Sequence, residues 1–263
     1  MKSIRVIISA FILSCFLSAG IYGQQSAKEI MLKTRDVSKI PGLETVATLK
    51  IIDPKGRERI REISMASKIV DNGKTEKRVI RFLAPAEVKG TGMLIYDYDA
   101  ASDDMWIYMP ALRKTRRIAS GEKNQSFMGS EFSNADLAAP NTEDFDYKIT
   151  GNETVDGADC WKIESSPLTQ VIADETGISK KIVWIGKKDY VCRKTEFYDP
   201  EGELSKILTC SDVRKMAEGK YMAASMQMEN VQNGRKSSFT MSQMQYNPAV
   251  KEEYFTVASL EKI

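Results

Sequence analysis

The sequence predicts a mainly β protein in which one wide, curved antiparallel sheet wraps around a helical plug. Turn sequences divide most of the chain into runs rich in Val, Ile, Thr, Tyr and Phe. One of these runs, 57–70, would extend about 46 Å as an unbroken strand. Strands of that length twist and curl, so a single curved sheet is favoured over two small stacked ones.

The first 23 residues have the pattern of a secretory signal peptide. Lys2 and Arg5 precede an apolar stretch that ends in small residues. We therefore expect cleavage near residue 23 and a soluble periplasmic protein, a single domain over 24–263. The alternative is a lipoprotein, because residues 12–15 loosely resemble a lipobox. Against it, the residues after Cys15 are apolar, where a lipoprotein would begin a polar tether.

Composition excludes several classes of function. The chain has 38 Lys and Arg against 36 Asp and Glu, whereas a nucleic-acid-binding protein needs a basic excess. It has no histidine, which removes His-based triads and HExxH zinc sites. Paired carboxylates such as Asp103 and Asp104 lack a neighbouring nucleophile or base. We therefore expect a protein that is not an enzyme and uses no metal or cofactor.

An amphipathic helix is predicted over 26–38. Ser26 and Glu29 form a capping box, and apolar residues recur at helical spacing after them. Pro41 ends the helix. Its apolar face must be buried, and the concave side of the sheet is the natural place.

The strands follow this helix and are separated by turns. Asn72-Gly73 supplies the positive φ of a tight hairpin. In 221–229, apolar residues alternate with polar ones, which indicates a sheet covered on one side. The predicted strands are 44–52, 57–70, 77–83, 105–109, 180–185, 190–198, 204–210, 221–231 and 237–246.

The middle of the chain, 85–147, departs from this hairpin pattern. It includes a long stretch, 118–139, in which two exposed-looking phenylalanines stand among small and polar residues. Long loops in compact domains are usually lids or binding loops. We therefore expect a functional loop here.

Two motifs in this region carry a family resemblance. Trp106-x-Tyr108-x-Pro-Ala-Leu-Arg113-Lys-x-Arg-Arg-Ile is followed by Ser126-Phe-Met-Gly-Ser-Glu-Phe132. The chain thereby resembles periplasmic outer-membrane lipoprotein-sorting-like proteins, which are related in fold to the carriers LolA and LolB. The resemblance implies a half-barrel plugged by helices, with an apolar cavity for acyl chains. It also implies a membrane transporter of the RND/MMPL type as partner.

The candidate ligand-binding residues are large apolar side chains expected to line that cavity. Methionine is flexible and polarizable, so a wall of methionines adapts to varied chains. Ordinary core filling is the alternative for every one of them, and also the favoured role of Cys160, Cys192 and Cys210. The cavity candidates are Phe82, Trp106, Trp184, Met222, Met226 and Met228.

The candidate partner-binding residues combine arginines with aromatic side chains, as interface hot spots do. Guanidinium groups bind phosphate and carboxylate in a bidentate manner, whereas a solvated hairpin tip is the alternative reading of the basic cluster. The candidates are Tyr108, Arg113, Arg116, Arg117, Phe127 and Phe132.

Two functions remain open on the sequence. The first is a carrier that binds lipid or lipoprotein acyl chains and passes them toward the outer membrane with an RND-type transporter. The second is an envelope sensor or interaction module of the same fold, which docks a membrane protein through the arginine and aromatic residues.

Overall fold

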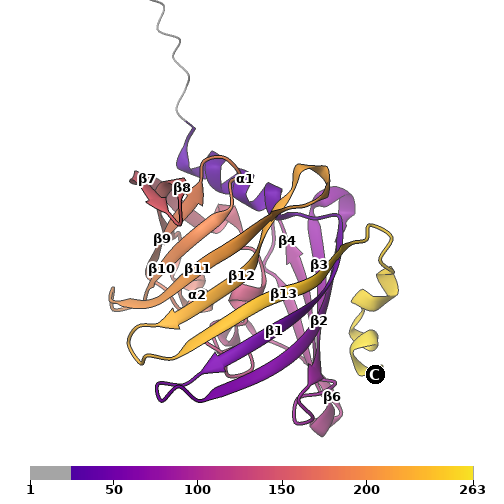
Figure 1. The fold of residues 1–263 in the computed structure, drawn as a ribbon. Coiled ribbons are helices and arrows are strands. Elements are labelled where there is room, and N and C mark those ends of the chain that lie inside the picture. Colours follow the sequence, from indigo (N-terminus) through magenta and orange to yellow (C-terminus); the bar gives the residue numbers. More distant parts are fainter. Residues whose placement is uncertain (1–24, 263) are drawn as a thin grey trace, which may run out of the picture.

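The computed structural model describes residues 25–262, so the predicted signal peptide lies outside the described residues. Thirteen strands form one antiparallel sheet, accompanied by the helices α1 (Ala27–Ser38) and α2 (Gln170–Thr176) (Figure 1). The first six strands are β1 (Gly42–Ile52), β2 (Glu58–Val70), β3 (Thr75–Ala84), β4 (Gly92–Tyr98), β5 (Asp104–Met109) and β6 (Lys114–Arg117). The other seven are β7 (Phe145–Val155), β8 (Ala158–Pro167), β9 (Lys180–Gly186), β10 (Cys192–Tyr198), β11 (Leu204–Lys215), β12 (Tyr221–Asn230) and β13 (Lys236–Tyr246).

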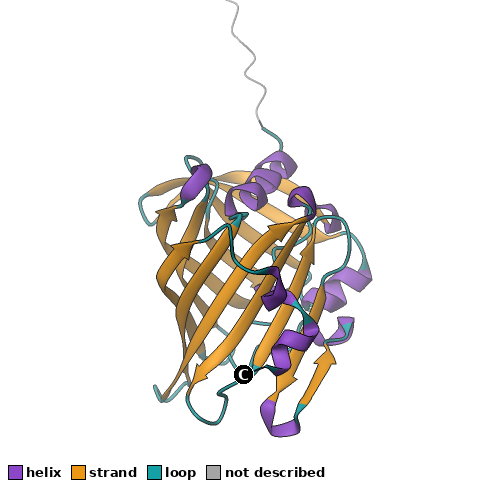
Figure 2. Ribbon diagram, turned by 90° about the vertical axis from the view of Figure 1, so that its right-hand side faces the viewer, coloured by secondary structure: helices purple, strands orange, loops and turns teal. Residues whose placement is uncertain are grey.

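The strand order shows how the chain builds this sheet. From β1 the strands step outward one by one to β6, which forms one edge. The chain then crosses to the opposite edge and returns strand by strand from β7 to β13, which pairs with β1. The sheet curves around its own interior (Figure 2). The predicted single curved antiparallel sheet is confirmed.

Residues 118–144, here called the crossing segment, make the connection between the two edges. It contains three short 3-10 turns (Ser120–Glu122, Ala135–Leu137 and Thr142–Asp144) and no strand. Its length has a topological cause, because it joins β6 to β7 and these are the two outermost strands of the sheet. A short turn links only strands that are neighbours.

Helix α1 begins with the predicted capping box. Ser26 Oγ accepts a hydrogen bond from the Glu29 amide (3.2 Å), and Glu29 Oε2 accepts one from the Ser26 amide (2.8 Å). Ala27 and Ile30 are buried against Ile163 and neighbouring apolar residues of β9. The helix lies across one end of the sheet (Figure 1). None of the helices in 25–262 is long and apolar enough to cross a membrane.

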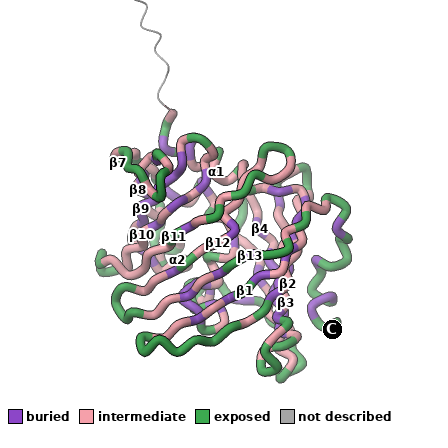
Figure 3. The backbone as a smooth tube through the Cα atoms, in the orientation of Figure 1, coloured by how far each residue is buried: buried purple, intermediate pink, exposed green. Residues whose placement is uncertain are grey.

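The C-terminal residues cover part of the outer face of the sheet. Two 3-10 turns, Glu252–Phe255 and Val257–Glu261, place Phe255 and Leu260 over Leu94, and all three side chains are fully buried. Figure 3 shows buried positions in this segment as well as in the sheet. Strand β4 is therefore apolar on both faces, which explains why the two-residue alternation did not predict it.

Candidate functional site: an apolar cavity on the concave face

The concave face of the sheet holds a cavity of about 390 Å³. Ligand pockets in proteins usually measure about 300–1,000 Å³. Helix α1 and the crossing segment cover it, and strands from both halves of the sheet form its wall. The lining is mostly apolar, and its larger side chains are Met31, Ile40, Leu43, Met65, Ile80, Phe127, Phe132, Leu137, Leu208, Met222, Met226, Phe239 and Met241.

Two of the three methionines predicted to bind a ligand line the apolar cavity. Met222 and Met226 of β12 line the cavity beside Met241 of β13. Ala224 and Met228 share the same face of β12, as the alternation predicted, but Met228 is buried beside a second cavity. Their role in binding an acyl chain stays a prediction.

The two phenylalanines of the crossing segment are inside the protein. The expectation that they form an exposed partner surface is wrong, because only 1% of Phe127 and 5% of Phe132 is exposed. Phe127 packs against Phe82 with ring centroids 5.7 Å apart, and Phe132 packs against Phe239 at 6.4 Å. The segment crosses the concave face, so its apolar side chains complete the core there.

Basic residues of the sheet allow this polar backbone to be buried. Buried carbonyl groups need hydrogen-bond donors. Three cations of the strands and Arg235 of the β12–β13 turn donate to carbonyl oxygens of the segment, of which only that of Gly129 belongs to an exposed residue. Arg61 donates to Met128 O, Arg78 to Leu137 O, Lys206 to Glu131 O and Arg235 to Gly129 O. The crossing segment is thereby bound to the sheet between Met128 and Leu137.

Arg35 joins the cover of the cavity to its rim. Its guanidinium contacts Asp97 (2.5 Å) and Asp99 (3.1 Å), and it also donates to the carbonyl oxygens of Ala139 and Pro140. Its side chain is 10% exposed and that of Asp97 is 2% exposed. Burial alone would lower the pKa of Arg35, but Asp97 and Asp99 outweigh it and raise this pKa. One residue therefore holds α1, β4 and the crossing segment together.

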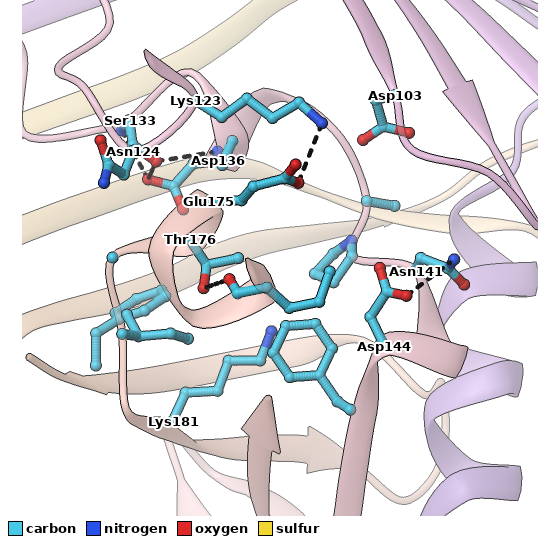
Figure 4. Close-up of a pocket in the computed structure, with 18 of the residues that line it drawn as sticks. Asp103, Lys123, Asn124, Ser133, Asp136, Asn141, Asp144, Glu175, Thr176 and Lys181 are labelled. Carbon is cyan, nitrogen blue, oxygen red and sulfur yellow. Dashed lines mark hydrogen bonds and ion pairs between the residues drawn. The ribbon is translucent and has the colours of Figure 1, made fainter. Parts of the chain in front are cut away.

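A second, polar cavity of about 410 Å³ lies on the other side of the crossing segment (Figure 4). Lys123 Nζ lies 3.3 Å from Glu175 Oε2 and donates to Ser102 Oγ. Asp103 also borders this cavity, and burial followed by the charge of Asp97 raises its pKa to about 7.

Lys181 forms another part of the polar cavity's wall. Its side chain is buried, with its ammonium 4.5 Å from the ring centroid of Phe145. Burial lowers the pKa of Lys181 to about 8, although Asp136 acts in the opposite direction.

Besides Met228, three more of the predicted cavity residues do not line the apolar cavity. Phe82 lies on the correct face, but it fills the core behind Phe127. Trp184 is buried away from both cavities, where its Nε1 donates to Glu153 Oε2 (3.0 Å) and Lys194 Nζ lies 4.5 Å from its ring centroid. Trp106 packs on Tyr96 beside the C-terminal cluster. In both tryptophans the strand alternation directs the side chain to the outer face.

The predicted partner-binding surface is smaller than the sequence indicated. Tyr108 is buried beneath the C-terminal turns. Arg116 pairs with Glu122 at 2.7 Å, and Arg117 pairs with Asp104. Arg113 is exposed at the tip of the β5–β6 hairpin. The basic cluster is therefore partly neutralised within the chain, and its binding role stays a prediction.

Arg35 and Lys181 were missed from the sequence, although a signal was present for each. Arg35 follows Met31 by four residues, so it shares the apolar stripe of the helix. Lys181 alternates in phase with Val183 and Ile185, which both pack against α1. A charged residue at the helical or strand spacing of an apolar face is the pattern that identifies such buried charged positions.

The curved open sheet, the helical cover and the apolar cavity between them define a LolA-like half-barrel. Among solved structures, a LolA superfamily protein from Nitrosomonas europaea has this fold, with 20% sequence identity and a TM-score of 0.67 over 89% of this chain and 98% of that one. Residues 74–262 match the model of a family described as uncharacterized proteins, DUF1329. The chain belongs to this family.

Two further solved structures are more similar. A domain from Vibrio parahaemolyticus, described as an outer membrane lipoprotein-sorting protein domain, is 27% identical, with a TM-score of 0.82 over 90% of this chain and 98% of that one. A DUF1329 family protein from Desulfovibrio piger is 29% identical, with a TM-score of 0.82 over 89% of this chain and 97% of that one. The comparison with curated proteins gave no match.

Proposed function

We propose that the protein is a periplasmic carrier that binds an acyl chain of a lipid or lipoprotein in the apolar cavity. The observation that carries the proposal is the cavity itself, an apolar space of about 390 Å³ that the core side chains leave unfilled. The similarity to a domain described as lipoprotein-sorting supports the same function and an envelope location.

Hydrophobic burial provides enough free energy for this function. Each buried CH₂ group contributes about 0.8 kcal/mol, so a chain of about 14 carbons gains on the order of 10 kcal/mol. Association and ordering costs offset part of this gain, and micromolar or tighter binding remains. The flexible methionines of the wall adjust to chains of different shape.

Release requires the cover to move. Helix α1 and the crossing segment lie over the cavity and are joined through Arg35. We propose that delivery toward the outer membrane proceeds when a partner displaces this cover. An RND/MMPL-type transporter is the partner implied by the family resemblance, and the exposed hairpin tip with Leu112 and Arg113 is the surface proposed to contact it.

The alternative, an interaction module that binds no lipid, is less well supported. It depends on an exposed surface of arginines and aromatic residues. Tyr108, Phe127 and Phe132 are buried, and two of the arginines have partners within the chain. The buried phenylalanines border the cavity, which favours the carrier function.

Filling the cavity tests the proposal. Met226→Trp adds a bulky side chain to the lining, and Gln227→Trp places the same group on the exposed outer face of the same strand. We expect native mass spectrometry of protein purified from the periplasm to show bound lipid in the wild type and in Gln227→Trp. Met226→Trp should lose at least about tenfold in acyl-chain affinity, equivalent to about 1.4 kcal/mol. Lipid-free wild-type protein with no affinity for acyl probes would disprove the proposal.

A further inference from the structure

The polar cavity contains the ammonium group of Lys181. Lys181 belongs to β9 and its side chain is only 7% exposed. Within residues 25–262, its Nζ has neither a hydrogen bond nor an ion pair, and its close neighbour is the face of the Phe145 ring. A buried charge is costly unless it is paired. This arrangement is typical of a site whose counter-ion arrives with a ligand.

The neighbouring strands place polar groups beside Lys181, of which Lys206 lines the cavity and Ser165 does not. Ser165 lies opposite Lys181 in the β8–β9 register, and its fully buried hydroxyl lacks a hydrogen bond in the described part of the chain. On the other side, Phe197 pairs with Lys181 and also with Lys206 of β11. Directly opposed residues of antiparallel strands share a face. Lys206 also lines the cavity, and its Nζ is bonded to a carbonyl oxygen of the crossing segment rather than to a carboxylate.

Other groups contact the carboxylates of the cavity, which are those of Asp103, Asp136, Asp144 and Glu175. Glu175 pairs with Lys123, and Asp136 accepts hydrogen bonds from the amide and hydroxyl of Ser133. Figure 4 shows Lys123, Glu175 and Asp103 on one side of the cavity and Lys181 on the other. Of these acids, only Asp136 acts on the charge of Lys181. Within residues 25–262, Lys181 therefore has no carboxylate as an ion-pair partner.

The two cavities are separated by one stretch of backbone. Asp136, Ala139 and Pro140 of the crossing segment contribute to the walls of both. The polar cavity is thus next to the space proposed for the acyl chain. An apolar and a polar space therefore lie side by side along this backbone.

We infer that the polar cavity binds an anionic oxygen group, a carboxylate or a phosphate, through Lys181. The group belongs either to the head of the acyl ligand or to a free small acid. In the first case the inference rests on the proposed function, and in the second it is independent of it.

The test compares two ligands with the same chain. Dodecanoate and dodecanol are titrated against the wild type, Lys181→Met and Lys180→Met. Lys180 is a matched control, because it belongs to the same strand and also lies over a ring, that of Tyr198, but it has Glu164 as a partner 3.8 Å away. Wild type and Lys180→Met should bind dodecanoate at least about tenfold more tightly than dodecanol, and Lys181→Met should lose this preference while its affinity for dodecanol is unchanged.

A second measurement needs no variant. NMR of ¹³Cε-labelled lysine follows the lysine signal that titrates near pH 8, the pKa of Lys181. Dodecanoate should raise this pKa and dodecanol should not. If acetate or inorganic phosphate alone raises it, the inference holds with a free acid as the source.

The outcomes separate this inference from the proposed function. Equal binding of dodecanoate and dodecanol, with no effect of any acid on Lys181, would overturn the inference and leave the carrier function intact. Binding of acetate or phosphate at Lys181 without any acyl affinity would support the inference and disprove the carrier function.

Discussion

At the scale of single residues, the interior of this protein is unusually rich in charge. Arg35, Arg78, Lys181 and Glu131 are all wholly or largely buried. Asp97 pairs with Arg35, Glu76 with Arg78 and Arg235 with Glu131. Within residues 25–262, Lys181 has no ion-pair partner. The destabilising effect of this buried charge can therefore be measured as a free energy of unfolding.

Replacing Lys181 by methionine should stabilise the empty protein. The pKa of Lys181 falls from 10.5 in the unfolded chain to about 8 in the folded one, so the unfolded state binds more protons between these values. Wild-type stability therefore rises as pH increases from about 8 to about 10.5. Urea unfolding should show Lys181→Met more stable by about 3 kcal/mol at pH 7, with the difference about 1 kcal/mol smaller at pH 9. Lys180→Met should show no such pH dependence.

Asp103 should have the opposite dependence on pH. Its pKa is raised from 3.8 to about 7, so the folded state binds the additional proton and wild-type stability falls as pH rises from about 4 to about 7. Asp103→Asn keeps an acceptor for the amide of Tyr98 and loses the charge. We expect roughly 2–4 kcal/mol of added stability at pH 8 and little change at pH 4, measured by urea unfolding. An equal effect at both pH values would contradict the burial of this carboxyl.

Sequence reasoning at this scale succeeded where one face of a strand is polar. The methionines of β12 alternate with Ser225 and Gln227, so their face could be assigned. In β9, Lys181–Gly186 are buried on both faces, so hydrophobicity could not show that Trp184 points outward. The face to which a side chain of this strand points depends on which residues cover each face of the sheet. Those residues come from distant parts of the chain.

At the scale of elements, α1 and the crossing segment behave as one cover because Arg35 joins them. The capping box identified the helix from sequence. The crossing segment was recognised as unusual, but its burial was not predicted, because small and polar residues usually indicate a surface loop. Here the donors that satisfy its backbone come from arginines and lysines of the sheet, which the local sequence does not reveal.

Removing the link at Arg35 should loosen the cover. Arg35→Met leaves Asp97 buried without its partner, which typically costs about 3–5 kcal/mol. We expect a loss of this size in the free energy of unfolding, and faster hydrogen exchange in α1 and in residues 135–142. Lys28→Met is the matched control, because Lys28 also joins α1 to the crossing segment, but through an exposed pair with Glu143 (48% and 61% exposed). Its loss should stay below about 1 kcal/mol.

At the scale of the whole molecule, the first and the last strand of the chain, β1 and β13, are neighbours in the middle of the sheet. Strand β1 pairs with β13 over most of its length, from Leu43 opposite Tyr246 to Ile52 opposite Lys236. The edges, β6 and β7, belong instead to the middle of the sequence. The single curved sheet could be predicted from strand length, but this closure could not, because pairing between residues about 200 apart leaves no local signal.

Hydrogen exchange should follow this arrangement. We expect amides in the paired centre of β1 and β13 to exchange slowest, at the rate set by global unfolding, and those on the outer sides of β6 and β7 to exchange fastest. Mass spectrometry of the exchanged, digested protein measures both. Equal protection in the centre and at the edges would show that the edges are covered by another surface in solution.

The crossing segment has a mechanical consequence. It connects the two edge strands of the curved sheet covalently. Hydrogen bonds also hold it to the concave side, and their donors are Arg61, Arg78, Lys206 and Arg235. The sheet cannot flatten unless the crossing segment moves or its hydrogen bonds to the sheet break. The curvature of the sheet and the packing of its interior therefore change together. On the carrier function proposed above, we expect a ligand that pushes on this segment to displace the edge strand β6, whose hairpin bears Arg113. A partner bound to that hairpin would then respond to the bound ligand without contacting it.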